Sequence, residues 1–180
     1  MKTHLALLRG INVSGQKLIK MEDFRKLLEN KGFINVQTYI QSGNVFFDTD
    51  ENNTHLASKI SQIILNHYGY EVSIVTVAME DLEFVLNNNP FYFENEETKQ
   101  LYISFLTEKP TSLDFEELKK CDFKNDVFAI SDRFLFLKYG DSAANTKLDN
   151  KIIEKKLKVT ATTRNWNTTN KLFQIFKDRV

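Results

Sequence analysis

The chain has 180 residues and no net charge, because 24 lysines and arginines balance 24 aspartates and glutamates. This length suits one domain or two small domains that share an interface, and the overall charge argues against a general polyanion-binding protein. A single cysteine, Cys121, excludes an internal disulfide bond and is typical of a reducing compartment. The N-terminal apolar run is too short for a secretory signal, and no run reaches the roughly 18 apolar residues of a membrane span. We therefore expect a soluble, cytoplasmic protein.

The charges are unevenly distributed along the chain. Residues 1–20 carry four basic side chains and no acid, which gives +4. Residues 147–179 carry nine basic and three acidic side chains, which gives +6, so the remainder of the chain carries −10. If the two ends meet in space, they form a basic face on a neutral protein. The alternative is that both ends are simply solvated.

The first half of the chain alternates short apolar runs with segments of helical spacing. After Met21, Glu22 and Asp23 suit the first turn of a helix, and Gly32 is placed as a C-cap residue. The polar turn at residues 41–44 is expected to hold Gly43 or Asn44 at positive φ. The first half thus predicts strands at residues 5–8, 36–40, 45–47 and 72–77, and helices that begin near residues 21, 54 and 80.

The second half repeats this order of elements. Thr111 or Ser112 is expected to cap its first helix. Strands are predicted at residues 101–106, 127–130, 134–139 and 159–162, with later helices over residues 148–157 and 166–176. The polar, acidic residues 90–99 are interpreted as a linker between a first half of residues 1–89 and a second half of residues 100–180.

Both halves therefore read strand, helix, strand, strand, helix, strand, helix. The first six elements have the order of a ferredoxin-like βαββαβ unit, an antiparallel sheet with helices on one face. The halves share no residue-level identity, so the duplication is one of pattern only. We predict an α+β fold with two ferredoxin-like halves in one compact unit.

The loop over residues 10–17 comes near the phosphate-binding pattern G-x-x-x-x-G-K-[ST]. Gln16 stands where that pattern needs its lysine, and Leu18 cannot bind Mg²⁺. The following helix also begins too late to point its N-terminus into the loop. We interpret this segment as a glycine-bearing connection rather than a nucleotide-binding loop.

Polar side chains gather around the turn at residues 41–44. Arg9 ends an apolar strand, which is a costly place for a charge unless it is paired or binds an anion. Tyr39 and Gln41 alternate with Ile40, so they are expected to share one face of a strand. These three residues are candidates for binding a ligand, whereas Gly43 and Asn44 are also suited to forming the turn itself.

A second polar cluster follows at residues 162–168. Asn165 is suited to capping the last helix, and Trp166 to anchoring it. Arg164, just before a helix N-terminus, opposes the helix dipole. An arginine beside free backbone N–H groups makes a good anion site, so Arg164 is a further ligand-binding candidate.

No pattern of catalytic or metal-binding residues is present. The histidines at positions 4, 55 and 67 have no metal-ligand spacing, and no nucleophile elbow surrounds Ser42. Cys121 lies in a charged stretch without a catalytic signature. The sequence predicts no metal and no cofactor, and it leaves open both turnover and oligomeric state.

The quoted motifs resemble one known family. The segments ALLRGINV, KMEDFRKLLENKGF and VQTYIQSGNVFF, together with KLDNKIIEKKLKVTATTRNWNTTNKL, are similar to the signatures of the bacterial domain of unknown function 1697 family. The resemblance covers nearly the whole chain. It implies a compact α+β protein of two ferredoxin-like halves, and it implies no activity.

Three positions depart from the pattern of that family. A second glycine in the first loop is replaced by Ser14-Gly15, and Ser-Lys-Leu before the late helix reads Thr146-Lys147-Leu148. Leu-Gly after that helix reads Leu157-Lys158. Thr146 and Lys147 keep the hydroxyl group and the lysine of the family pattern, so we still expect a site at this segment.

The leading hypothesis is the binding of a phosphate-bearing or other anionic small molecule in a polar site between the halves. The charged residues of this site would bind the anion, and its polar residues would orient the ligand. The residues expected to line it are Arg9, Asn12, Lys20, Tyr39, Gln41, Asn44, Lys147, Arg164 and Asn165.

Two alternatives remain open. The first is an RNA-binding module whose sheet aromatics stack bases, although an RNP1-type pattern is absent; the strand aromatics are Tyr39, Phe46, Tyr102, Phe136 and Tyr139. The second is a structural or partner-binding protein in which the polar motifs only brace the two halves.

Overall fold

The computed structural model describes residues 1–51 and 53–179, and the chain forms two compact units in it. The first unit is Met1–Asp81 together with the chain from Leu172 onward, and the second is Leu82–Lys171. The division differs from the predicted boundary at residues 90–99. It falls inside two helices, α3 (Met79–Asn87) and α6 (Trp166–Arg179), so each unit takes part of both.

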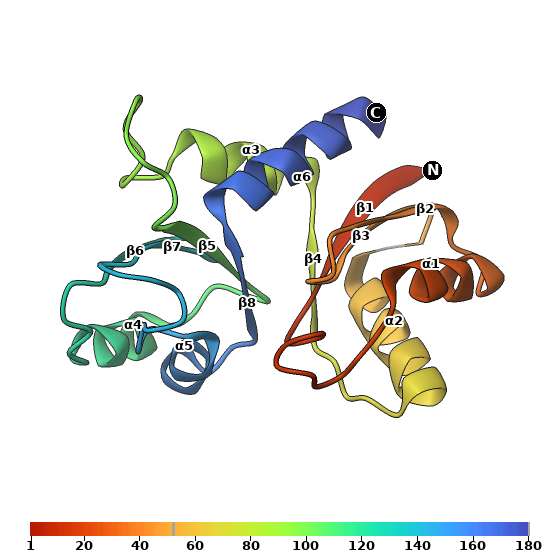
Figure 1. The fold of residues 1–180 in the computed structure, drawn as a ribbon, viewed down its shortest axis with the longest axis horizontal. Helices are drawn as coiled ribbons and strands as arrows, with labels where there is room; N and C mark the ends of the chain where they lie inside the picture. Colours follow the sequence, from red (N-terminus) through yellow and green to blue (C-terminus); the bar gives the residue numbers. More distant parts are fainter. Residues whose placement is uncertain (52, 180) are drawn as a thin grey trace. The chain divides into compact units, whose positions relative to one another are not determined.

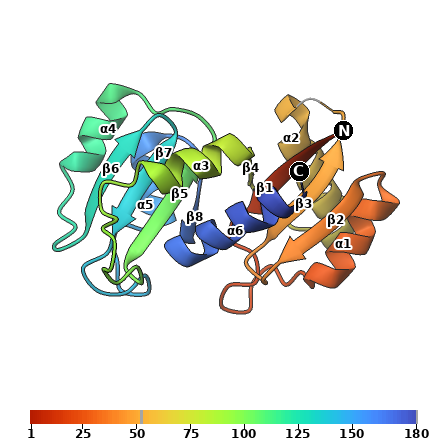
Figure 2. The same cartoon turned by 90° about the horizontal axis from the view of Figure 1, so that it is seen from above.

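The first unit has the predicted element order. Its sheet has the strand order β2-β3-β1-β4 and is antiparallel throughout, which is the order of a ferredoxin-like βαββαβ unit (Figure 2). Its elements are β1 (Lys2–Leu8), α1 (Met21–Asn30), β2 (Ile34–Tyr39), β3 (Asn44–Thr49), α2 (Asn53–Tyr68) and β4 (Ile74–Val77).

The second unit repeats this topology with the strand order β6-β7-β5-β8. Its elements are β5 (Leu101–Leu106), α4 (Ser112–Lys119), β6 (Val127–Ser131), β7 (Phe134–Lys138), α5 (Asn150–Leu157) and β8 (Ala161–Asn165). Thr111 caps α4, because its side chain accepts a hydrogen bond from the Asp114 N–H. The α+β fold with two halves of like topology is therefore confirmed.

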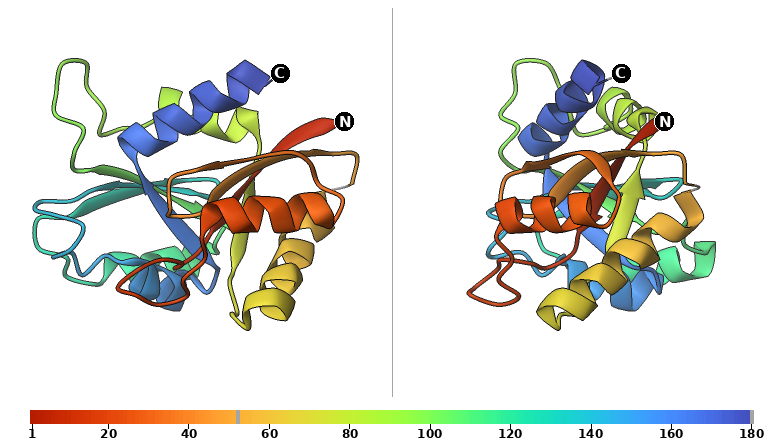
Figure 3. Two further views of the ribbon diagram at one scale, coloured as in Figure 1. Left: turned by 45° about the vertical axis from the view of Figure 1, so that its right-hand side comes forward. Right: turned by 90° about the vertical axis from the view of Figure 1, so that its right-hand side faces the viewer.

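The core of the first unit lies between its sheet and helices α1 and α2, which cover one face side by side (Figure 3). Ala6 and Val45 are direct cross-strand partners on that face, and Phe24 and Ile60 pack against it from the helices. On the opposite face, Phe46 meets Phe176 of α6 edge-to-face, with ring centroids 5.6 Å apart. Because both faces of the sheet are covered, the sequence of β1 is a continuous apolar run and does not alternate between apolar and polar residues.

The second unit is built in the same way. Helices α4 and α5 cover one face of its sheet, where Leu118 and Ile153 pack against Leu135 (Figure 1). On the other face, Phe84 of α3 lies against Phe134, with ring centroids 5.6 Å apart. Both faces of the central strands β5 and β7 are therefore also largely buried.

Several strand boundaries differ from the sequence prediction, and the differences in β2 and β8 affect candidate site residues. Strand β2 ends at Tyr39, and Ile40 has a left-handed backbone with φ 50°, which costs a β-branched residue about 1–2 kcal/mol. Strand β8 covers Ala161–Asn165 instead of residues 159–162, so Arg164 lies within the strand. Lys158 closes α5 with φ 56°, at the position where the family pattern has glycine.

Asp48 joins four elements of the first unit. Its carboxylate accepts hydrogen bonds from Thr3 Oγ1 (2.7 Å) in β1 and from Asn35 Nδ2 (2.7 Å) in β2. The same carboxylate forms an ion pair with Arg179 Nη2 (3.1 Å) at the end of α6. Burial would raise the pKa of Asp48, but the hydrogen bonds from Asn35, Thr3 and Arg179 outweigh it and lower that pKa. These four residues are the Asp48 cluster.

The Asp48 cluster predicts a pH-dependent loss of stability in Arg179→Gln. At pH 7 we expect the free energy of unfolding to fall by about 2 kcal/mol, the scale of a lost hydrogen bond to a charged group. The contribution of a carboxylate with a lowered pKa is present above its unfolded pKa of about 3.9 and is lost as pH falls through the folded value. The difference from wild type should therefore shrink at pH 3, as measured by urea unfolding.

Lys177→Gln is the matched control for this prediction. Lys177 lies on the same exposed end of α6 and contacts the face of the Phe173 ring. Its replacement should change the stability by less than about 0.5 kcal/mol. An equal loss in both variants would show that the Asp48 cluster adds nothing specific.

Replacing Gly43 by alanine should destabilise the protein through a steric clash, and the same change at Gly32 serves as the control. A Cβ at Gly43 (φ +81°) would lie 2.7 Å from Leu8 Cβ and 2.8 Å from Ile11 Cδ1, whereas one at Gly32 (φ +90°) would meet nothing within 4 Å. Both Gly→Ala changes incur the left-handed backbone cost of about 1–2 kcal/mol. Gly43→Ala should lose about 1–3 kcal/mol more, through overpacking, in denaturant unfolding. Equal losses would contradict this account.

Candidate functional site

Asn12 fastens the loop between β1 and α1. Its Nδ2 donates to Ile19 O (2.9 Å) and to Gln41 O (2.8 Å), while its Oδ1 accepts from Ile19 N (2.8 Å). Asn12 itself is left-handed, with φ 54°. The structure therefore brings Asn12 and Gln41 together as predicted, but the Asn12 amide is used in holding the loop against the neighbouring turn.

The same loop shows no nucleotide-binding geometry. Ser14 and Lys17 are also left-handed, with φ 50° and 46°, and Lys17 Nζ donates to Glu71 O (2.5 Å). Lys20 is exposed at the N-cap position of α1 and provides no side-chain cap. The loop is followed by Lys20 and does not run directly into the N-terminus of α1, as a phosphate-binding loop would. Its glycines therefore allow the chain to reverse direction.

Asn44 and Tyr39 face each other as a cross-strand pair of β2 and β3. Asn44 is fully buried, and its Nδ2 donates to Tyr39 O (2.9 Å) and Ser42 Oγ (3.2 Å). Gly43 has the expected positive φ of 81°, but Ile40 also turns left-handed and takes Gln41 out of the strand. The prediction that Tyr39 and Gln41 share one strand face is therefore wrong.

Arg9 directly follows β1 and is half-buried. Its backbone N–H donates to Ser73 O (2.9 Å), which ties the end of β1 to the segment before β4. Arg9 thus lies one residue beyond the end of β1, which is the position that the sequence predicted.

In the second unit, Arg164 is 8% exposed and lies in β8 opposite Ile103. Its Nη1 donates to Thr162 Oγ1 (3.0 Å) and to Thr163 O (3.0 Å). Burial lowers the pKa of Arg164 to about 10, so the side chain remains charged at neutral pH. Asn165 Oδ1 accepts from Thr168 N (2.7 Å), which confirms its role as the cap of α6.

Lys147 is exposed beside a small cavity of about 180 Å³ in the second unit. The neighbouring Thr146 Oγ1 donates to Asp126 Oδ2 (2.5 Å), and Asp126 Oδ1 accepts from Gly140 N (2.8 Å). These bonds hold the two loops that border the cavity. Lys147 lines this cavity, whereas Arg164 is not among its lining residues.

The aromatic residues proposed for stacking RNA bases are mostly in the core. Phe46, Phe136 and Tyr139 are at most 3% exposed. Tyr102 packs against Tyr139 with ring centroids 4.7 Å apart, and burial raises the pKa of Tyr139. The rings of Phe46, Phe136 and Tyr139 are therefore not exposed for base stacking, whereas Tyr39 and Tyr102 are half-buried.

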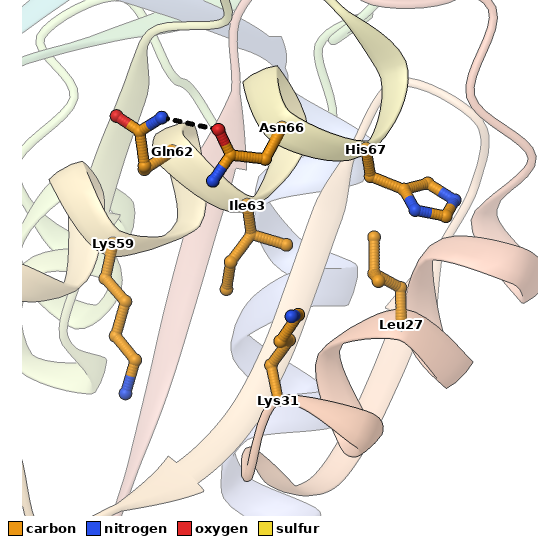
Figure 4. A pocket seen from close by; sticks show the side chains of 7 residues that line it. All are labelled: Leu27, Lys31, Lys59, Gln62, Ile63, Asn66 and His67. Atoms are coloured by element: carbon orange, nitrogen blue, oxygen red, sulfur yellow. Dashed lines mark hydrogen bonds between the residues drawn. The ribbon is translucent and has the colours of Figure 1, made fainter.

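A groove between α1 and α2 was missed by sequence reasoning. It has a volume of about 440 Å³ and is lined by Leu27, Lys31, Lys59, Gln62, Ile63, Asn66 and His67. Figure 4 shows Leu27 and Ile63 pointing into the space between the helices, with Lys59 towards one end and His67 towards the other. The available signal was helical spacing, because Lys59, Ile63 and His67 are four residues apart on α2.

The electrostatic character of this groove is basic. None of the seven lining residues is acidic. Lys59 Nζ forms an ion pair with Glu51 (2.5 Å) outside the lining and lies 5.0 Å from the centre of the Phe33 ring, which fixes its position. Gln62 Nε2 donates to Asn66 Oδ1 (2.8 Å), a bond that links neighbouring turns of α2 beside the groove (Figure 4).

Among residues 1–51 and 53–179, no three His, Cys, Asp or Glu side chains are grouped in a way that would hold a metal ion. Over those same ranges, none of the helices combines the length and apolar character needed to cross a membrane.

Comparison with known proteins gives a family and a structural relative. A solved structure of conserved bacterial protein SP0830 from Streptococcus pneumoniae is similar over 97% of this chain and 98% of its own, with 26% sequence identity and a TM-score of 0.71. Curated proteins provide no match. The family model described as "Protein of unknown function (DUF1697)" matches residues 1–136. The chain therefore belongs to the DUF1697 family of proteins of unknown function.

Proposed function

We propose that the protein binds a phosphate-bearing or other anionic small molecule in the groove between α1 and α2. The observation that carries this proposal is the pair of lysines, Lys31 and Lys59, beside an apolar floor formed by Leu27 and Ile63. Ammonium groups bind phosphate as point charges, and an apolar floor excludes water from the remainder of a ligand. The volume of about 440 Å³ falls in the range of small-molecule sites.

The other lining groups supply orientation. The amides of Gln62 and Asn66 are both donors and acceptors, and His67 adds a ring with one donor and one acceptor when neutral. An incoming anion would compete with Glu51 for Lys59, because the two side chains already form an ion pair. Lys31 is consequently the stronger contributor of charge to a ligand.

The ligand class is the one inferred from sequence, but the proposed site is the groove between α1 and α2 rather than the polar sequence motifs. Asn12, Asn44 and Asn165 use their side chains to fasten loops and to cap a helix. The charged residues Arg9, Lys20, Lys147 and Arg164 remain the competing set for anion binding. A cytoplasmic location belongs to the same proposal, and the single cysteine supports it.

A thermal-shift panel with paired variants tests this function. The panel contains nucleotides, phosphorylated metabolites and short RNA. A ligand at a hundredfold excess over its Kd should add about 2.7 kcal/mol to the stability of wild type. The double variant Lys31→Gln/Lys59→Gln should lose this shift, because both ammonium groups are removed while the apolar floor stays.

Lys26→Gln is the matched control, since Lys26 lies on α1 outside the groove in an exposed pair with Glu22. It should keep the full ligand shift. A shift that survives the double variant but disappears in Arg9→Gln or Lys147→Gln would place the site at the sequence motifs instead. Binding of RNA alone, with a steep salt dependence, would favour the nucleic-acid alternative.

A further inference from the structure

A second cavity, of about 580 Å³, lies in the first unit beyond the end of β4. Strand β4 pairs with β1 only from Leu5 to Leu8, so Lys2–His4 have β3 as their only strand neighbour among the described residues. The start of α3 and the end of α6 complete the walls. The lining residues are Met1, Lys2, Thr3, His4, Ala78, Met79, Glu80, Phe176 and Arg179.

His4 is 8% exposed and stacks on Phe47, with ring centroids 5.7 Å apart. Its Nε2 is buried and forms no hydrogen bond with any residue of the described ranges. Leaving a buried ring nitrogen without a partner costs free energy that an apolar residue of similar shape would not incur. A histidine at this position is therefore better explained by a ligand that reaches it than by packing alone.

Arg179 also carries a buried nitrogen without a hydrogen-bond partner among the described residues. Its Nη1 donates to Gln37 Oε1 (3.1 Å), and its Nη2 donates to Asn35 O (2.7 Å) and Asp48 Oδ1 (3.1 Å). These bonds hold the guanidinium in place, whereas its Nε is buried without an acceptor among the residues that the structure describes. Two orphaned nitrogens, on His4 and Arg179, thus belong to residues that line one cavity.

The charges around the cavity restrict the ligand. Arg179 is already paired with Asp48, and the Met1 ammonium is paired with Asp50 (2.9 Å). Lys2 and Glu80 carry opposite charges. The surroundings are therefore close to neutral, which disfavours a dianion, while Ala78, Met79 and Phe176 offer apolar surface.

We propose that this cavity binds a small apolar monocarboxylic acid, whose carboxylate accepts hydrogen bonds from His4 Nε2 and Arg179 Nε. The carboxylate supplies the missing acceptor for both nitrogens, and the apolar part lies against Met79 and Phe176. This site shares no lining residue with the groove between α1 and α2. It therefore stands independently of the proposed function.

Three probes that share a phenyl ring and carry different polar groups test this proposal: phenylacetate, phenylacetamide and phenyl phosphate. Each is titrated into isotope-labelled protein while the ring signals of His4 are followed by NMR. Phenylacetate should shift these signals saturably. The neutral amide and the phosphate ester should each bind at least tenfold more weakly, the first because it lacks the charge and the second because Glu80 and Asp48 repel its second charge.

His4→Phe keeps the aromatic stacking on Phe47 and removes Nε2. Phenylacetate affinity, measured by calorimetry on this variant, should fall at least tenfold, while His55→Phe, an exposed histidine on α2, should keep wild-type affinity. The Lys31→Gln/Lys59→Gln variant should also bind phenylacetate normally, which separates this site from the groove. Unchanged affinity in His4→Phe, or no probe that shifts the His4 signals, would overturn the proposal.

Discussion

The carboxylate of Asp48 is the interaction on which the first unit depends. It lies on β3 and accepts hydrogen bonds from β1, from β2 and from the last turn of α6. Three donors around one carboxylate compensate for its partial burial, which is why its pKa is lowered rather than raised. The end of α6 is held on this unit by this ion pair together with the packing of Phe176 on Phe46. The two residues that carry the orphaned nitrogens, His4 and Arg179, both line the second cavity.

Most of the fold could be predicted from local sequence patterns. Leu101–Leu106 begins and ends where its apolar run does, and Thr111 caps α4 as its residue type indicates. Two turns have backbone conformations that their residue types do not favour. Ile40 is left-handed although β-branched residues avoid that region, and Lys158 takes the same conformation where glycine is usual. Both side chains are exposed, and the left-handed backbone belongs to the turn after β2 and to the C-cap of α5.

The candidate sites were less accessible to sequence reasoning. Asn12 and Asn44 look like ligand-binding residues because a sequence does not show where an amide donates, and both donate to backbone carbonyls. The groove residues of α2 have ordinary helical spacing, which describes any solvated helix face equally well. His4 and Arg179 are 175 residues apart in the chain, and their two unsatisfied nitrogens become evident only when the strand and the final helix turn are in place.

The discontinuity of the first unit has a consequence for biosynthesis. The second unit is one continuous segment, Leu82–Lys171, whereas the first needs the chain from Leu172 onward. As the ribosome proceeds from the N-terminus, the middle segment is available in full before the first unit is. Until the final turn emerges, Phe46 lacks its partner Phe176 and Asp48 lacks Arg179. The earliest-synthesised sheet is therefore the last to have both faces covered, because α6 packs on it only after the second unit has been made.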